Sequence, residues 1–301
     1  MDRGQQTDAI GPTDTLPRSV MGYEVIDYIG EGAASLLYAV SHPETAQIYA
    51  LKHVTPKSDK DQRFIEQLET EYHVGQLVRH AGLRRSIEMK VNRTLFRKVT
   101  EAALVLELFD GQPLDSLPLR STVGVVDIFI QVAEALDALH GIGYVHCDLK
   151  PNNILVNAQG DVKVIDLGQA CAVGTAKSRI QGTPDYISPE QVKCASVTPQ
   201  TDIYNLGATL YWALTGTHIP TLYTLKRTEN SFLVDGQLAS PKDLNPLVPE
   251  QLSNLVMECV RTNPAKRPQG MRDIILRLEI VRHVLRKKNS GSGTGMRPAL
   301  V

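Results

Sequence analysis

The segment His-Cys-Asp-Leu-Lys-Pro-Asn-Asn at 146–153 contains side chains that could act together on a phosphate. Asp148 has a carboxylate that can accept a hydroxyl proton, and Lys150 has an ammonium that can neutralise phosphate charge. Asn153 has an amide oxygen, and Asp166 further along the chain has a second carboxylate. Both are hard oxygen ligands of the kind that Mg²⁺ prefers. The spacing therefore indicates a site for proton transfer, phosphate binding and a divalent metal.

The pattern around this segment indicates how these groups are positioned. Residues 123–140 carry an apolar stripe at helical spacing, formed by Ile128, Val132, Leu136 and Leu139. The apolar run 154–156 follows the segment, so 146–153 is predicted to be a loop that leaves a helix and enters a strand. Asp166 stands at the end of another apolar run, 162–165, which is predicted to be a strand.

The loop and the second carboxylate resemble two motifs of the Hanks-type (eukaryotic-like) serine/threonine protein kinase family. The loop matches H-R-D-x-x-x-x-N with Cys147 for Arg, and Asp166-Leu167-Gly168 matches D-F-G with Leu167 for Phe. The resemblance covers about 23–284. It implies an α+β, bilobal protein kinase fold, with a small β-rich N-lobe containing one helix and a larger, mainly α-helical C-lobe. It also implies ATP and Mg²⁺ as cofactors and protein Ser/Thr hydroxyls as substrates.

The resemblance implies the boundaries of the kinase domain, and composition indicates the tails on either side of it. We expect a kinase domain at 21–288, with the N-lobe at 21–107 and the C-lobe at 111–288. The segments 1–20 and 289–301 are rich in Gly, Ser, Thr and Pro and are predicted to be disordered tails. Whether these tails lead to further domains stays open.

The overall composition is that of an ordinary globular protein of 301 residues, with 42% hydrophobic and 22% charged residues. A formal charge of -1 provides no field that favours nucleic acid or a membrane surface. No apolar stretch approaches the ~18 residues of a spanning helix. The four cysteines form no C-x-x-C pair, which is typical of a reduced chain. We therefore predict a cytoplasmic protein with no nucleic-acid partner and no membrane segment.

A glycine-containing turn and a following lysine indicate a nucleotide site. The turn at 30–35 could simply close a hairpin, but glycines also let backbone N–H groups approach phosphates. Ser35 replaces the family's third glycine, and Lys52 stands where the family lysine contacts the α- and β-phosphates. Backbone groups of Glu107 and Phe109 are expected to hold the adenine edge. The resemblance implies that ATP is bound by Ile29, Gly30, Glu31, Gly32, Ala33, Ala34, Ser35, Leu37, Ala50, Lys52, Glu107, Phe109 and Leu155.

A helix is predicted at 64–77, and it offers two candidate partners for Lys52, Glu69 and Glu71. We choose Glu71 because its spacing from His80 matches the family. Gly75 stands one turn later, where the family has a bulky apolar residue. The glycine is expected to leave a gap and a loosely held helix, so that Gly75→Leu would raise activity.

The segment Arg84–Lys98 is rich in cations. It is either a pair of solvated strands with a turn or a docking face for an acidic partner.

The resemblance assigns roles in the C-terminal half residue by residue. Asp148 would accept the substrate proton, Lys150 would stabilise the γ-phosphate, and Asn153 and Asp166 would hold Mg²⁺. The string at 182–190, Gly-Thr-Pro-Asp-Tyr-Ile-Ser-Pro-Glu, resembles the segment that receives the substrate peptide, and Thr183 would contact Asp148 and Lys150. The expected structural residues are His146, Glu190, Asp202 and Arg267, with Glu190 pairing with Arg267 and Asp202 bracing the catalytic loop.

Cys147 is the main departure from the family pattern, because the family arginine there grips a phosphate on the activation loop. Phosphorylation of Thr175 or Ser178 is therefore not expected to be the main switch. A redox role for Cys147 is an alternative to inert packing. The alternatives to an active kinase are a pseudokinase scaffold and a small-molecule phosphotransferase, but Lys52 and both carboxylates are present, and so is the substrate segment at 182–190.

Overall fold

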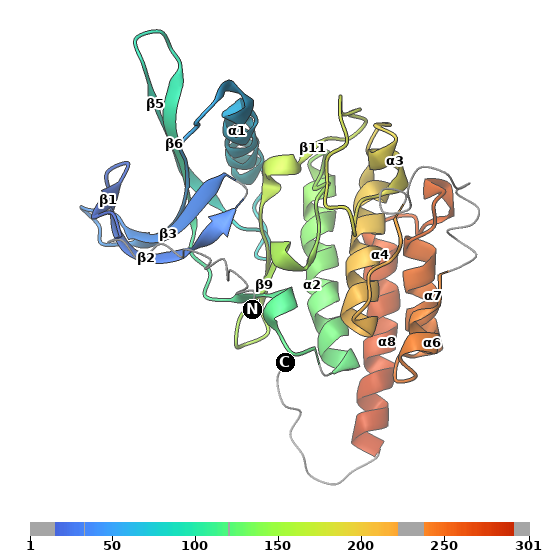
Figure 1. Cartoon of the computed structure of the whole chain (residues 1–301). Coiled ribbons are helices and arrows are strands. Elements are labelled where there is room, and N and C mark those ends of the chain that lie inside the picture. The colour runs from blue at the N-terminus through green and yellow to red at the C-terminus, as the bar shows by residue number, and fades with distance from the viewer. Residues whose placement is uncertain (1–15, 33, 120, 222–237, 292–301) are drawn as a thin grey trace, which may run out of the picture.

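The computed structural model describes residues 16–32, 34–119, 121–221 and 238–291. The chain folds into the predicted bilobal α+β architecture, with a curled sheet and one long helix in the N-lobe and a helical C-lobe (Figure 1). Most of the two predicted tails lies outside the described residues. Strand β1 (Ser19–Val20) already lies within the segment predicted as an N-terminal tail, and helix α8 (Met271–Gly291) extends past the expected boundary at 288.

The N-lobe sheet is antiparallel and has the order β1-β2-β3-β4-β6-β5. Its other strands are β2 (Tyr23–Gly32), β3 (Ser35–Ser41), β4 (Ile48–Val54), β5 (Ser86–Arg93) and β6 (Val99–Glu107). Side chains alternate between the two faces of a strand. Ala50 and Val54 of β4 accordingly pack with Ile65 and Leu68 of helix α1 (Gln62–Leu77). Lys52 lies between Ala50 and Val54 with the same parity, so the alternation directs it to the helix side.

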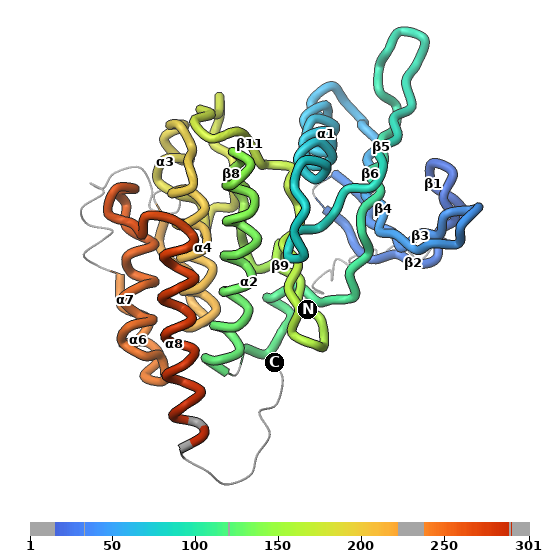
Figure 2. Tube along the Cα trace, turned by 180° about the vertical axis from the view of Figure 1, so that it is seen from behind, coloured from blue at the N-terminus to red at the C-terminus, as the bar shows by residue number. Residues whose placement is uncertain are grey.

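The C-lobe is built around one large apolar core shared by four helices. These are α2 (Thr122–Gly141), α4 (Pro199–Thr215), α7 (Glu250–Cys259) and α8, and Figure 2 shows α8 lying along α2. Two short helices, α3 (Pro189–Val192) and α6 (Pro241–Leu244), complete the described helical part. Helix α4 begins at Pro199, and the Thr198 side chain caps its N-terminus. This cap places Asp202 in the first turn.

Short strands and 3₁₀ turns carry the loops that face the N-lobe. Strands β7 (Gln112–Pro113), β9 (Ile154–Val156) and β10 (Val162–Val164) form one small sheet, and β8 (Tyr144–Val145) pairs with β11 (Cys171–Ala172). The described 3₁₀ turns are η1 (Asp59–Asp61), η2 (Leu114–Ser116), η3 (Pro151–Asn153), η4 (Leu167–Gln169) and η5 (Pro264–Lys266). The segment 146–153, called the catalytic segment below, thus follows β8 and ends with η3. Asp166 caps η4.

The two lobes are joined by contacts beyond the connecting chain. The Arg84 N–H donates to Val164 O at 3.0 Å, and the Val164 N–H donates to Gly82 O at 2.7 Å. At the same edge, Lys163 Nζ lies 2.9 Å from Glu107 Oε1. No helix among the described residues is long and apolar enough to cross a membrane.

Candidate active site

A large cleft lies between the lobes, and the predicted nucleotide-binding residues gather in it. Ala33 lies outside the described residues. The other residues predicted to bind ATP line the cleft together with Asp148, Lys150, Asn153, Asp166 and Thr183.

Lys52 connects helix α1 to the Asp-Leu-Gly turn. Its Nζ donates to Glu71 Oε2 at 2.8 Å and to Asp166 Oδ1 at 3.1 Å. Burial alone would lower the pKa of Lys52, but the two carboxylates outweigh it and raise that pKa. Burial would likewise raise the pKa of Asp166, but the Lys52 ammonium holds it well below its usual range. The predicted choice of Glu71 agrees with this geometry, because Glu69 instead lies 3.9 Å from Arg93.

Arg84, predicted to lie in an exposed basic segment, instead supplies a second cation at Glu71. That prediction is wrong for Arg84, which is 8% exposed and lines the cleft. Its Nη2 lies 3.5 Å from Glu71 Oε1, and its buried Nε has no hydrogen-bond partner among the described residues. The sequence places two arginines side by side at 84 and 85, and no local pattern tells which of them faces inward; the structure buries Arg84 and exposes Arg85.

The expected gap at Gly75 is also absent. A Cβ built on Gly75 would lie 2.3 Å from Ser86 Oγ and 2.9 Å from Ser86 Cβ, so the side chain of β5 already fills the space. Ser86 Oγ donates to Glu71 O at 3.0 Å, and Gln76 Nε2 donates to Ser86 O at 2.6 Å. Helix α1 is therefore tied to β5 at this point, and the gap on which the prediction of a loosely held helix rested is not there.

The catalytic segment forms a closed ring of polar contacts with the predicted substrate segment. Thr183 Oγ1 donates to Asp148 Oδ1 at 2.9 Å and accepts from Lys150 Nζ at 2.9 Å. Lys150 Nζ also lies 3.2 Å from Asp148 Oδ2. Asn153 Nδ2 donates to Asp148 O at 2.8 Å. The nitrogen of this amide is thus committed to the loop, and its oxygen is left for another partner.

The donor set around Asn153 and Asp166 fits a magnesium ion that is completed by water and phosphate oxygens. No cluster of three or more His, Cys, Asp or Glu side chains with metal-binding geometry occurs in the described parts of the chain. Mg²⁺ is usually held by one or two protein ligands plus substrate phosphates. One amide oxygen and one ionised carboxylate at the edge of the cleft match that requirement.

Asp202 holds the backbone of the catalytic segment from behind. Its Oδ2 accepts from the His146 N–H at 2.8 Å, and its Oδ1 accepts from the Cys147 N–H at 2.9 Å. His140 Nε2 contacts the same carboxylate at 2.8 Å. Burial would raise the pKa of Asp202, but the contact with His140 and the hydrogen bonds lower it. Cys147 has φ 66°, a strained conformation for a residue with a side chain, and Asp202 stabilises it.

The other predicted structural contacts are present as well. Arg267 Nη1 and Nη2 donate to the two carboxylate oxygens of Glu190 at 2.7 and 3.0 Å. His146 is fully buried, and its Nε2 lies 3.2 Å from Ile165 O, next to the Asp-Leu-Gly turn. These side chains support the site without facing the cleft.

A family model for the protein kinase domain matches residues 23–279. The chain belongs to the protein kinase family. A probable serine/threonine-protein kinase of Clostridium perfringens is 26% identical over 273 residues, which are 86% of this chain and 38% of that protein. PknA of Mycobacterium tuberculosis, a serine/threonine-protein kinase, is 29% identical over 261 residues, covering 81% of this chain and 58% of PknA. PknK of the same species is 29% identical over 263 residues, covering 84% of this chain and 23% of PknK.

These relatives are longer than the chain, which spans between 23% and 58% of their length. Their identity to this protein kinase is modest. The departures at Ser35, Gly75, Cys147 and Leu167 therefore have to be judged from the structure itself.

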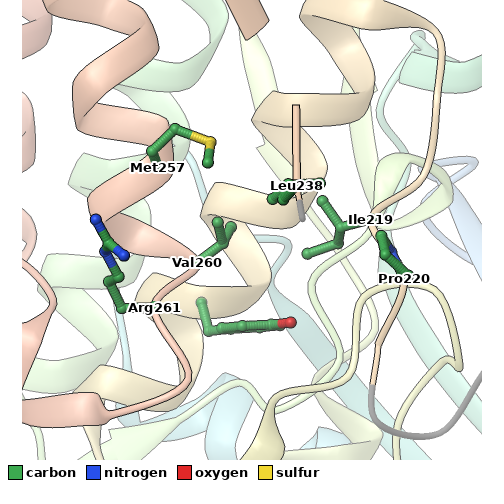
Figure 3. A pocket seen from close by; sticks show the side chains of 7 residues that line it. Ile219, Pro220, Leu238, Met257, Val260 and Arg261 are labelled. Carbon is green, nitrogen blue, oxygen red and sulfur yellow. The ribbon is translucent and has the colours of Figure 1, made fainter. Parts of the chain in front are cut away.

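A second hollow of this protein kinase lies within the C-lobe, away from the cleft. Figure 3 shows Met257, Val260 and Ile219 around it, and Arg261 at its side. Its full lining is Tyr204, Ile219, Pro220, Leu238, Met257, Val260 and Arg261. The hollow is small and mostly apolar, so it lacks the groups that phosphate chemistry requires.

Proposed function

We propose that the chain is an active serine/threonine protein kinase, which transfers the γ-phosphate of ATP to Ser/Thr hydroxyls of proteins. The observation that carries the proposal is the convergence of two polar sets on one cleft. Lys52 bridges Glu71 and Asp166 on one side, and Thr183 links Asp148 to Lys150 on the other. Positioning and electrostatic stabilisation account for most of phosphoryl transfer, so both sets are required together.

Each group has a role that its environment suits. Lys52, oriented by Glu71, would hold the α- and β-phosphates. Asp148 would accept the substrate hydroxyl proton, and Lys150 would neutralise charge that develops on the γ-phosphate. Thr183 would hold Asp148 and Lys150 at their present separation.

Asn153 and Asp166 would hold Mg²⁺, which supplies charge neutralisation at the phosphate oxygens when bound. Backbone groups of Glu107 and Phe109 would bind the adenine edge. The Glu107 N–H already donates to Arg85 O at 2.9 Å, so its carbonyl is the group left for this purpose.

The test is ADP production from Mg²⁺-ATP with a generic protein substrate, compared between the full chain and Asp148→Asn. We expect a loss of about 10²–10⁴-fold, the usual contribution of a general base. Asp137→Asn is the matched control, because Asp137 pairs with Arg272 on the C-lobe surface, and its rate should be unchanged. Phosphoamino-acid analysis should find phosphoserine or phosphothreonine. Nucleotide binding without turnover in the wild-type chain would favour the pseudokinase instead.

The activation segment, residues 169–190, is proposed not to be switched mainly by phosphorylation. Cys147 replaces the arginine that would bind a phosphate, and the Thr175 hydroxyl already donates to Ala172 O at 2.7 Å. Alanine at both Thr175 and Ser178 should leave the rate nearly unaltered. A large loss in this double variant would contradict the proposal.

An acidic docking partner remains a proposal for a narrower surface than first expected. The β5–β6 hairpin projects beyond the sheet (Figure 1). Arg93, Arg97 and Lys98 are exposed on it, Arg85 is exposed just before β5, and Leu95 and Phe96 at the tip are 100% and 93% exposed. Charge reversal at Arg97 should weaken binding of an acidic protein substrate, so that the KM for that substrate rises. The kcat measured with a neutral peptide should be unchanged. An unchanged KM would remove this surface from consideration.

A further inference from the structure

Two thiols connect the catalytic segment to the start of the activation segment. Cys147 Sγ and Cys171 Sγ lie 3.7 Å apart. Pairing of β8 with β11 fixes this proximity, because Cys171 is the register partner of Val145, two residues before Cys147. Cys147 is 2% exposed, whereas Cys171 is partly exposed at the surface. The arrangement is that of an accessible thiol backed by a buried second thiol.

The surroundings make Cys171 the more reactive member of the pair. The hydrogen bond between the two thiols lowers the pKa of Cys171 to about 7, and Lys177 and Thr175 contribute in the same direction. The same hydrogen bond, together with burial, raises the pKa of Cys147. Thiolates are the nucleophiles in oxidation, so a peroxide should react first at Cys171.

We propose that Cys171 and Cys147 are a peroxide-sensitive pair, which forms a reversible disulfide between the activation segment and the catalytic segment. The Cys171 thiolate attacks a peroxide oxygen, the O–O bond breaks, and Cys171 becomes a sulfenic acid while the leaving hydroxide takes up a proton to form water. The Cys147 sulfur then attacks the Cys171 sulfur. The S–S bond forms, hydroxide leaves and combines with the Cys147 proton as a second water. Two thiols are oxidised and one hydrogen peroxide is reduced.

The required movement is small. The sulfurs must approach from 3.7 Å to about 2.05 Å; Cys171 lies on β11, and Cys147 lies two residues past the end of the paired strand β8. The bond would link Cys147, the neighbour of Asp148, to the segment that carries Thr183. It would therefore restrain the activation segment at the residue where the family uses an arginine to grip a phosphate. Any effect on the rate rests on the proposed function, whereas the cross-link itself does not.

The first experiment treats the purified full chain with hydrogen peroxide and maps its peptides without reduction. We expect a loss of two hydrogens in the intact mass and a peptide pair joined through Cys147 and Cys171, both reversed by dithiothreitol. Cys147→Ser should instead accumulate sulfenic acid at Cys171, trapped by dimedone. Cys194→Ser is the matched control, since Cys194 is also partly exposed, and it should leave the cross-link unchanged. Sulfinic acid at Cys171 in the wild type, or a cross-link through Cys194, would overturn the proposal.

The second experiment measures the restraint without any use of activity. Lys177 and Arg179 offer trypsin sites within the activation segment. In the native protein, cleavage there should be several-fold slower after oxidation, and dithiothreitol should restore the original rate. Cleavage that is equally fast in both forms would show that the bond does not restrain the segment. Because neither readout needs phosphoryl transfer, failure here is distinguishable from failure of the kinase proposal.

Discussion

Two buried arginine–glutamate pairs in this protein have the same chemistry but very different surroundings. In the C-lobe, Arg267 donates to both oxygens of Glu190, and its remaining N–H groups reach the carbonyls of Arg261, Gln200 and Thr262. In the N-lobe, Arg84 meets Glu71 through one contact of 3.5 Å, and its Nε is unpartnered among the described residues. One pair is saturated with hydrogen bonds and the other is not.

The difference follows from what each pair adjoins. Glu190 and Arg267 lie within the packed C-lobe, and Thr201 adds a further hydrogen bond of 3.0 Å to the carboxylate. Glu71 is shared with Lys52 at the wall of the cleft. A buried charge with incomplete hydrogen bonding is costly, and such groups are tolerated mainly at functional sites. The saturated pair therefore lies in the packed interior of the C-lobe, whereas the incomplete pair lies at the wall of the cleft between the lobes.

The strongest test of the comparison removes the saturated arginine. Arg267→Met should lower the free energy of unfolding by about 3–5 kcal/mol, because Glu190 would remain buried without its partner. Urea unfolding followed by circular dichroism measures this loss. A loss below about 1 kcal/mol would break the contrast between the two pairs.

The pH dependence of that loss sharpens the argument. Burial would raise the pKa of Glu190, but the hydrogen bonds and charge of Arg267 hold it below its ordinary value. In the wild type this contribution is present above the unfolded pKa of about 4.3, and is lost as the pH falls through the folded pKa.

In Arg267→Met the sign reverses, since an unpartnered buried carboxyl has a raised pKa. The stability deficit of the variant should therefore shrink as the pH falls from 7 to about 5. Urea titrations at several pH values check this. A deficit that is constant over this range would mean that Glu190 is not the origin of the loss.

The next effect concerns the packing beside the incomplete pair. Gly75→Ala should destabilise the protein by about 1–2 kcal/mol, because overpacking against Ser86 exceeds the gain in helix propensity. Gly124→Ala in α2 is the matched control, since its new Cβ would meet only ordinary contacts at 3.7 Å or more. That variant should be neutral or slightly more stable in thermal unfolding. Equal behaviour of the two variants would contradict the tight packing of α1 on β5.

The smallest effect is expected at the incomplete pair itself. Arg84→Met should change the free energy of unfolding by less than about 1 kcal/mol, because Glu71 keeps Lys52 and the apolar side chain fills the site. A double-mutant cycle with Glu71→Gln measures the coupling energy of the pair. A coupling energy as large as that between Arg267 and Glu190 would show that the two pairs contribute equally to stability.

The sequence was a good guide wherever a motif stands in one stretch of chain. The fold, the catalytic segment and the contacts of Thr183 and Asp202 follow from local strings whose order matches the protein kinase family. The environment of Gly75 could not be predicted, because the side chain that fills its space belongs to Ser86 on another strand. The inward orientation of Arg84 depends on backbone bonds to Val164, far along the chain. The proximity of Cys147 to Cys171 likewise depends on strand pairing that no motif records.

The bonds between the segment 82–84 and β10 have a mechanical consequence. They lie at the same edge as the Lys163–Glu107 contact, so separating the lobes at this edge would require breaking two backbone hydrogen bonds and an ion pair. Gly30 and Gly32, at the end of β2, line the cleft itself. For the proposed kinase, we therefore expect nucleotide exchange to leave the contacts between 82–84 and β10 intact.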